Sequence, residues 1–333
     1  MNSGAGATVG VDVGGTKMLA VRLDSAGEVV AERKLPTPAA ADFIDAMAGV
    51  VSDLAGAPSA VGAVGLGVPG MVDSTGGLRS SPHLPGLVGL PIARDLAARF
   101  PDARVWVGND ATGAGWAEHS LGAAVGVDDL LMVTLGTGIG GGIVAGGRLL
   151  EGAHRYAGEV GHIIIDPNGP PCPCGQRGCW ERMASGSGLG RLAREWATAG
   201  RAPGVVALAG GDPEAVRGEH VTTAAASRDG DAIKLMGELA WWLALGLANL
   251  TNVLDPGLVV VGGGLAEAGE VLIAPAREAF ARLVEGHRHR PGLALVVAAL
   301  GERAGAVGAG LLAARGGTRL RGQPSGWRAR LRR

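Results

Sequence analysis

All three cysteines of the chain lie within eight residues, at Cys172, Cys174 and Cys179, and His162 precedes the first of them by ten residues. Three thiolates and one imidazole make the closed tetrahedral set that structural zinc prefers. Because this set leaves no coordination position for water, a zinc ion held here would brace a loop and would not take part in a reaction. A buried cysteine cluster and a redox pair are the alternatives. The odd number of cysteines disfavours a framework of structural disulfides.

Two carboxylates flank the predicted zinc ligands. Glu159 precedes His162 by three residues, and Glu181 follows Cys179 by two. A metal-braced loop holds neighbouring side chains in fixed positions, which is what recognition of sugar hydroxyls demands. The sequence therefore indicates a rigid site for a polar ligand beside the metal.

A first glycine-rich loop follows the opening apolar stretch of the chain. Its glycine N–H groups can approach a phosphate closely, its threonine hydroxyl can donate a hydrogen bond, and its lysine adds positive charge. The aspartate at the start of the loop can hold Mg²⁺ directly or through water. The predicted residues are Asp12, Gly14, Gly15, Thr16 and Lys17. A hairpin turn that binds nothing is the alternative.

A second loop, residues 136–142, formally matches the dinucleotide-binding pattern G-x-G-x-x-G. That pattern requires a helix to follow, but residues 143–147 read as a strand and a turn, so a dinucleotide-dependent enzyme is disfavoured. The chain also lacks the P-loop pattern. Two opposed hairpin loops that clasp a polyphosphate are the remaining interpretation, with Thr137 and Gly138 in the second loop.

A third glycine cluster follows a late apolar strand, and two polar residues follow an earlier one. The glycines Gly262, Gly263 and Gly264 leave room for a flat adenine ring or make a plain strand-to-helix turn.

Asn109 and Asp110 open a predicted helix. One of the two is expected to be the helix N-cap, and a carboxylate at this strand end is also placed to act as a general base toward a hydroxyl.

The elements that must position these residues alternate between strands and helices. The sequence predicts strands over Ala7–Val13, Lys17–Leu23, Glu28–Lys34, Val61–Val68, Ala103–Val107, Leu130–Leu135, Ile143–Ala145 and Leu258–Val261, and an apolar run over Leu293–Leu300. It predicts helices over Ala41–Leu54 and Ile92–Phe100 and from Ala111 onward. The segments TVGVDVGGTKMLAVRL and LMVTLGTGIGGGIVAG share one plan of buried strand, glycine loop and returning strand. We interpret this as an internal duplication.

Composition excludes several classes of function. Thirty basic and 31 acidic residues give a net charge of -1, so neither nucleic acid nor an anionic membrane is an expected partner. We expect no secretory signal and a cytoplasmic protein. The apolar stretch Leu235–Leu254 is interrupted by polar residues and is predicted to be a buried helix, not a membrane span.

Five motifs together resemble the ROK family of sugar kinases and repressors. They are DVGGTK at Asp12–Lys17, GNDATGAGWAE at Gly108–Glu118, LGTGIGGG at Leu135–Gly142, AGEVGH at Ala157–His162 and CPCGQRGCWE at Cys172–Glu181. The resemblance runs from about residue 8 to about residue 314. Within the family the chain resembles the ATP-dependent glucokinases of actinobacteria, in which the triplet CWE is familiar.

The resemblance implies an α/β fold of the actin/hexokinase-like (ribonuclease H-like) type, with two lobes and a duplicated βββαβαβα unit. The implied small lobe is 1–118, with about 302–314 returning to it, and the large lobe with the zinc motif is 119–301. We expect a basic, disordered tail at 315–333. A homodimer or homotetramer is also implied.

The resemblance also implies a role for each site residue. Asp110 corresponds to the base that takes the proton from the hexose 6-hydroxyl. Both phosphate loops would hold ATP with Mg²⁺, and the third glycine cluster would be the adenosine shelf. The implied sugar ligands are Asn109, Asp110, Glu159, Glu181 and His162, with the second ring nitrogen of His162 on zinc.

One departure bears on the substrate. Many relatives have Asn where this chain has His83, and Trp near Leu87, in a loop that borders the sugar pocket. Mannose, fructose and N-acetylmannosamine therefore stay open beside glucose, as does polyphosphate as the donor. A non-catalytic sugar-sensing regulator is the alternative from another class. The repressor branch is disfavoured because its DNA-binding domain precedes the first glycine loop, which here starts near residue 12.

Overall fold

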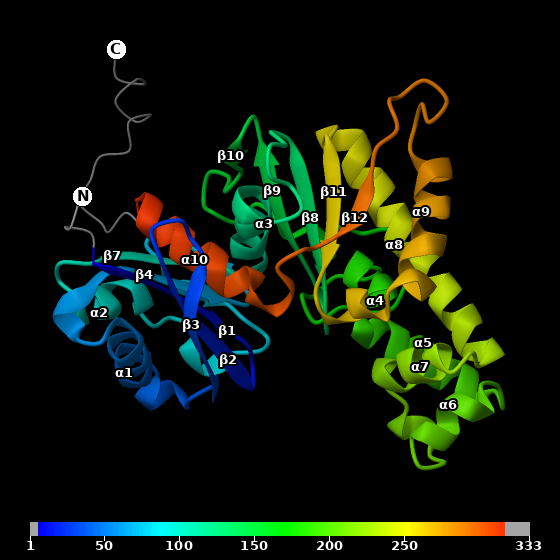
Figure 1. Cartoon of the computed structure of the whole chain (residues 1–333). Helices are drawn as coiled ribbons and strands as arrows, with labels where there is room; N and C mark the ends of the chain where they lie inside the picture. Colours follow the sequence, from blue (N-terminus) through cyan, green and yellow to red (C-terminus); the bar gives the residue numbers. More distant parts are fainter. Residues whose placement is uncertain (1–5, 317–333) are drawn as a thin grey trace. The chain divides into compact units, whose positions relative to one another are not determined.

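The computed structural model describes residues 6–316, which divide into two compact units (Figure 1). The first unit contains residues 6–117, 151–157 and 303–316, and the second contains residues 118–150 and 158–302. The chain therefore crosses between the units four times. Of the predicted tail, residues 317–333 lie outside the described residues.

The first unit is built on a five-stranded sheet in the order β3-β2-β1-β4-β7. The first three strands in sequence are antiparallel neighbours, and the other two run parallel to the first. The strands are β1 (Ala7–Val13), β2 (Lys17–Leu23), β3 (Val29–Pro36), β4 (Val61–Val68) and β7 (Arg104–Asn109), with a separate pair β5 (Met71–Val72) and β6 (Leu78–Ser80).

Helices pack against this sheet. They are α1 (Phe43–Ala55), α2 (Ile92–Arg99) and α10 (Ala304–Arg315), while α3 (Asp110–Leu121) follows β7 and continues into the second unit. The fully buried side chains of Phe43 and Leu96, on α1 and α2, pack in one core with those of the sheet. Burial of each such side chain stabilises the fold by about 1.5–3 kcal/mol. The α10 backbone approaches the sheet so closely that a Cβ atom at Gly10 would overlap the carbonyl oxygen of Ala306.

The second unit repeats this plan. Its sheet has the order β10-β9-β8-β11-β12, again with three antiparallel strands followed by two parallel ones. This shared order confirms the predicted duplication, because both halves read βββαβαβα. The strands are β8 (Leu130–Leu135), β9 (Ile139–Ala145), β10 (Arg148–Leu149), β11 (Leu258–Gly262) and β12 (Leu295–Val297), and the helices are α4 (Trp180–Ala184), α5 (Gly186–Thr198), α6 (Pro203–Leu208), α7 (Gly218–Ala226), α8 (Gly230–Leu254) and α9 (Glu270–Leu283).

The second glycine loop is shorter than the sequence predicts. Only Gly136–Gly138 turns the chain, because Leu135 already pairs with Ile139 across β8 and β9. The later glycines lie within β9 and serve packing: a Cβ atom at Gly141 would lie 2.7 Å from Cγ2 of Val160. The prediction that residues 136–142 form one turn was therefore wrong in its second half.

The long apolar stretch forms α8, as predicted, and much of the helix is buried in the core of the second unit. Among residues 6–316, no helix has the length and the apolar character needed to cross a bilayer.

Candidate functional site

Two aspartates lie at one edge of the first sheet. Asp12 is near the end of β1, and Asp110 is the first residue of α3, directly after β7. The register across the sheet pairs Asp12 with Gly67 and Gly67 with Gly108. A Cβ atom at Gly67, on β4 between these two strands, would lie 3.3 Å from the Cα atom of Asp110, so a glycine there lets β4 pass close to the start of α3. The carboxyl ends of parallel strands thus gather acidic groups at one place, as in other α/β proteins.

Burial and mutual repulsion change how these aspartates titrate. Burial, followed by the negative charge of Asp110, raises the pKa of Asp12 to about 7. Burial also raises the pKa of Asp110, although hydrogen bonds from backbone N–H groups and the nearby His83 oppose the rise. The pair therefore keeps a proton at a pH where exposed aspartates have lost theirs, and a cation bound beside it would favour the ionised form.

This raised pKa predicts that Asp12 destabilises the folded protein at neutral and alkaline pH. A carboxyl whose pKa is raised on folding contributes its full stability below the ordinary value of 3.8, and that contribution is lost as the pH rises toward 7. The upper bound of the loss is about 4 kcal/mol. Without added Mg²⁺, Asp12→Asn is expected to melt several degrees above the wild type at pH 8 and near it at pH 4.5. Equal differences in melting temperature at the two pH values would contradict this explanation.

Asn109 is held by the structure on both sides of its amide. Its Oδ1 accepts a hydrogen bond from the Thr112 N–H at 3.0 Å, so Asn109 caps α3, and its Nδ2 donates to the Gly70 carbonyl at 3.2 Å. The expectation that one of the two polar residues is an N-cap is therefore confirmed for Asn109. Oδ1 of Asp110 accepts a hydrogen bond from the Ala111 N–H at 2.8 Å. Because the amide of Asn109 serves as the cap, Asp110 is the residue of the pair that can act as a base.

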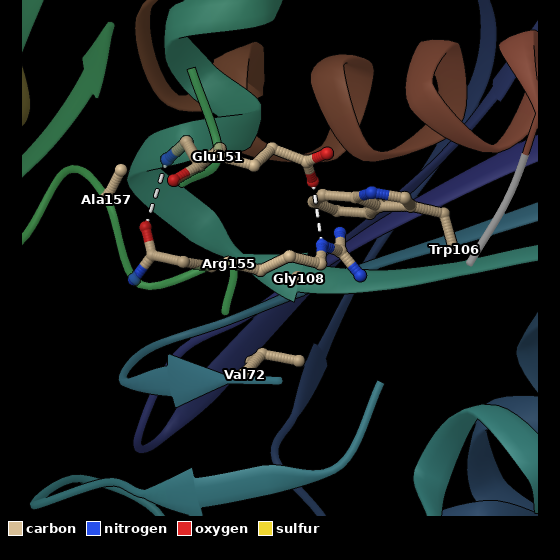
Figure 2. A pocket seen from close by; sticks show the side chains of 8 residues that line it. Val72, Trp106, Gly108, Glu151, Arg155 and Ala157 are labelled. Carbon is tan, nitrogen blue, oxygen red and sulfur yellow. Dashed lines mark hydrogen bonds and ion pairs between the residues drawn. The ribbon is translucent and has the colours of Figure 1, made fainter. Parts of the chain in front are cut away.

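A clamp made by Arg155 supports this corner of the first unit (Figure 2). Its Nε donates to Oε1 of Glu151 at 2.7 Å, its Nη1 donates to the Val107 carbonyl at 3.3 Å, and its guanidinium lies 5.6 Å from the Trp106 ring centroid. The clamp fastens residues 151–157 to β7. The cavity beside it has about 10 Å³ of free volume, room for about one water and none for a sugar.

The first glycine loop has the shape of a fixed hairpin with an exposed tip. The Gly14 N–H donates to the Lys17 carbonyl at 2.9 Å, and the Thr37 hydroxyl donates to the Gly14 carbonyl at 2.7 Å. Gly15, Thr16 and Lys17 are exposed at the tip. His83 lies against this loop, since a Cβ atom at Gly15 would be 3.5 Å from the Cβ of His83. The first unit therefore brings together the loop, His83 and both aspartates.

The second unit gathers the four predicted metal ligands. One ligand atom from each of His162, Cys172, Cys174 and Cys179 lies within 4.8 Å of all the others. The Sγ atoms of Cys174 and Cys179 are 3.6 Å apart, and Cys172 Sγ is 3.8 Å from His162 Nδ1. Tetrahedral zinc with bonds of about 2.3 Å to sulfur requires such spacings, so the residues fit the metal. Burial and the adjacent thiols raise the pKa of Cys179 to about 12, so binding a metal would release protons.

The predicted sugar ligands of the second unit lie around this cluster. His162 directs Nδ1 to Cys172, while its Nε2 lies 4.0 Å from the Glu159 carboxylate. The segment with Glu181 is tied to the same turn, because the Trp180 N–H donates to the Ile163 carbonyl at 2.8 Å. The fully buried Trp180 ring anchors that segment to α8 by donating to the Trp242 carbonyl at 2.8 Å. A metal ion held by this cluster would brace both segments.

Gly138 has a role that the sequence did not predict. The Ile139 N–H donates to Oε2 of Glu181 at 3.0 Å, and a Cβ atom at Gly138 would overlap this same oxygen. The backbone of the neighbouring Thr137 is held by a 3.3 Å hydrogen bond from the Ser187 N–H to its carbonyl. A residue predicted to bind phosphate therefore makes room for a predicted sugar ligand.

Gly138→Ala is expected to push the Glu181 carboxylate aside and to weaken sugar binding about 10- to 100-fold, the effect of losing one or two charge-assisted hydrogen bonds. Titration of the nucleotide-free protein with sugar, followed by tryptophan fluorescence, measures this affinity. Gly136→Ala is the matched control, because no atom lies within 4 Å of its new Cβ. Unchanged affinity in Gly138→Ala would show that Glu181 does not contact the sugar.

The third glycine cluster has a packing explanation for two of its three members. Gly263 has a φ of 83°, and its Cβ would overlap the Leu135 carbonyl oxygen. A Cβ atom at Gly262 would lie 2.8 Å from Met132 Cε, whereas Gly264 has open space around it. The short 3₁₀ helix Gly264–Ala268 follows. The strand-to-helix turn accounts for these residues, and the adenosine shelf stays a prediction.

Comparison with known proteins places this geometry in a family. The model of the ROK family matches residues 8–315. A glucokinase of Streptomyces coelicolor is 38% identical over 314 residues, covering 92% of this chain and 98% of that protein. An N-acetylmannosamine kinase of Escherichia coli O9:H4 is 35% identical, covering 86% of this chain and 95% of that protein.

A comparison with solved structures supports the same family. The ROK family glucokinase of Streptomyces griseus, crystallised with glucose and AMPPNP, superposes with a TM-score of 0.82 at 38% identity. The match covers 93% of this chain and 100% of that one. The expected actin/hexokinase-like fold is confirmed, and the chain belongs to the ROK family.

Proposed function

We propose that this protein transfers the γ-phosphoryl group of ATP to the 6-hydroxyl of glucose. The observation that carries the proposal is the Asp110 carboxylate, which lies at the start of α3 beside Asp12 and the first glycine loop. Membership of the ROK family and the similarity to glucokinases support the same reaction and the same sugar.

Asp110 acts as the general base in this proposal. Its raised pKa brings the carboxyl closer to the pH at which a base both stays ionised and accepts a proton effectively. In phosphoryl transfer such a group mainly orients the attacking hydroxyl, and stabilisation of the phosphate charge contributes most of the rate. Asp110 would therefore hold the 6-hydroxyl in line and receive its proton.

The first glycine loop supplies the positive groups for the phosphates. Lys17 and the hydroxyl of Thr16 are exposed at the loop tip, where they can contact phosphate oxygens. Mg²⁺ would neutralise charge on the phosphates, and the Asp12 carboxylate offers the oxygen donor that this ion prefers. Gly14 and Gly15 would let the backbone approach the nucleotide. The resemblance to the family assigns Thr137 and Gly138 to the phosphates as well.

We assign sugar selectivity to the segments around the metal cluster, and the resemblance to the family assigns Asn109 to the sugar as well. Glu159, Glu181 and Nε2 of His162 can each accept or share a hydrogen bond with a sugar hydroxyl. An epimer would leave one of the carboxylates buried without its partner, which costs about 1–3 kcal/mol or more. Within the first unit, His83 lies near enough to Asp110 to affect its pKa, so this departure from the family pattern bears on the choice of hexose.

A sugar-specificity profile tests the proposal. Values of kcat/KM with Mg-ATP should be highest for glucose among glucose, mannose, fructose and N-acetylmannosamine, and polyphosphate should be a poorer donor. A higher value for N-acetylmannosamine would reassign the substrate. Glucose binding without any turnover would favour the sugar-sensing regulator.

A further inference from the structure

Glu118 is a buried carboxylate that the mechanism above does not use. Its side chain is fully buried and accepts three backbone hydrogen bonds. Oε2 accepts from the Ala123 N–H at 2.8 Å and from the Ala299 N–H at 3.0 Å, and Oε1 accepts from the Leu300 N–H at 2.8 Å. We name this arrangement, Glu118 with the N–H groups of Ala123, Ala299 and Leu300, the Glu118 bracket.

The bracket joins the first and the last of the four crossings between the units. The first crossing falls between Ala117 and Glu118 within α3, and the last falls between Glu302 and Arg303, directly before α10. The bonded residues are 181 and 182 positions apart in sequence. All four residues of the bracket belong to the second unit. The segment around Glu118 and the segment with Ala299 and Leu300 are therefore bonded to each other near the points where the chain leaves the second unit.

The same two segments are also in contact within the first unit. A Cβ atom at Gly308 of α10 would overlap the carbonyl oxygen of Gly113 in α3, so the two helix backbones touch. A Cβ atom at Gly305, in the first turn of α10, would lie 2.7 Å from Cγ of Asp12. The helix that contains Glu118 thus begins at Asp110, and α10, which follows the other bonded segment, packs its first turn against Asp12.

We propose that Glu118 is a positioning residue, whose bracket ties α3 to the segment that leads into α10 and so sets the orientation of Asp110 for phosphoryl transfer. Glu118 lies eight positions after Asp110, a distance of about 12 Å along one helix. A shift of about 1 Å at a reacting group can cost about 100-fold in rate. The inference rests on the proposed phosphoryl transfer for its kinetic part alone.

The bracket requires a hydrogen-bond acceptor at both ends of the side chain, because three N–H donors converge on the two oxygens of Glu118. A glutamine has only one oxygen and must turn its own NH₂ group toward at least one of these N–H groups. Glu118→Gln therefore keeps the size of the side chain but loses one or two charge-assisted bonds and leaves buried N–H groups without a partner.

Gly122 gives a second way to disturb the bracket. A Cβ atom at Gly122 would overlap Oε2 of Glu118, so Gly122→Ala displaces the carboxylate without removing it. If both substitutions act through the bracket, Gly122→Ala adds little to the effect of Glu118→Gln, and the two changes in free energy are far from additive.

Hydrogen exchange tests the bracket without relying on activity. In the full-length protein, Glu118→Gln is expected to speed exchange at the amides of Ala299 and Leu300 at least tenfold, while amides in the middle of β4 and β11 keep their protection. Unchanged exchange at Ala299 and Leu300 would show that these bonds hold nothing in place, and it would overturn the proposal whatever the protein catalyses.

Kinetics test the positioning role. Both bracket variants are expected to lower kcat about 10- to 100-fold at 25 °C, while the glucose dissociation constant, measured without nucleotide, changes less than threefold. Leu272→Ala, at a fully buried position in α9, is the control for general destabilisation. An equal fall in kcat in this control, at a similar loss of melting temperature, would overturn the proposal. Absent turnover in the wild type would instead refute the proposed function.

Discussion

Replacement of Asp110 by Asn is expected to lower kcat about 10²- to 10⁴-fold, the usual contribution of a general base. Asparagine has nearly the same shape, and its Oδ1 can still accept the Ala111 N–H bond that Asp110 accepts at 2.8 Å. The variant loses the negative charge of the carboxylate and with it the ability to receive a proton. Sugar affinity should therefore change by no more than a few fold, and kcat and kcat/KM should fall together.

The pH dependence adds a second test of Asp110. The base must be ionised to accept a proton, and its pKa is raised by burial. The acid limb of kcat/KM should therefore lie above the ordinary value of 3.8, and activity should fall as the pH drops through that limb. Asp102→Asn, at an exposed aspartate before β7, is the matched control and should keep full activity. Full turnover in Asp110→Asn would remove Asp110 from the mechanism.

Loss of the metal cluster is expected to weaken sugar binding strongly while it leaves the proposed base, Asp110, unchanged. Cys179→Ser removes one of four ligands at a fully buried position. Cys179 also pairs with Ile164 in a short bridge and immediately precedes α4, which contains Glu181. We expect the bound zinc, close to one ion per chain in the wild type, to fall below about half, because structural zinc sites need all their ligands. Glucose affinity should fall more than about tenfold, because Glu181 and His162 lose their common brace.

Zinc analysis by mass spectrometry and glucose titration of the same samples measure both effects. Gln176→Ala lies in the same hairpin but removes no ligand, so it should keep both the zinc and the affinity. Chelation of the wild-type protein should reproduce the loss, and added zinc should restore binding. Wild-type protein that contains no zinc, or Cys179→Ser protein that binds glucose normally, would contradict a bracing role.

The sequence predicted the scaffold well where apolar runs end at glycines. Ala7–Val13, Lys17–Leu23, Val61–Val68 and Leu130–Leu135 are strands with the predicted bounds, because short apolar runs between flanking turns define them locally. The four residues of the metal cluster could also be predicted, since three of them lie within eight residues of the chain.

Relations between distant segments could not be predicted in the same way. Gly138 is one of several glycines in its loop, and nothing local indicates that Glu181, far along the chain, occupies the space beside it. The early start of β9 depends on its pairing with β8. Arg155 and Glu118 were missed for the same reason: their partners, Val107 and Ala299, are brought to them by the fold. For Glu118, the local signal was its acidic side chain after a run of small and apolar residues in α3.

The most direct test of the central claim is to incubate the purified protein with Mg-ATP and glucose and to quantify ADP and sugar phosphate together. Phosphoryl transfer to the 6-hydroxyl predicts glucose 6-phosphate and ADP in equal amounts, with neither formed by Asp110→Asn on the same time scale. Glucose binding without a sugar phosphate, or ADP formed without one, would contradict the account.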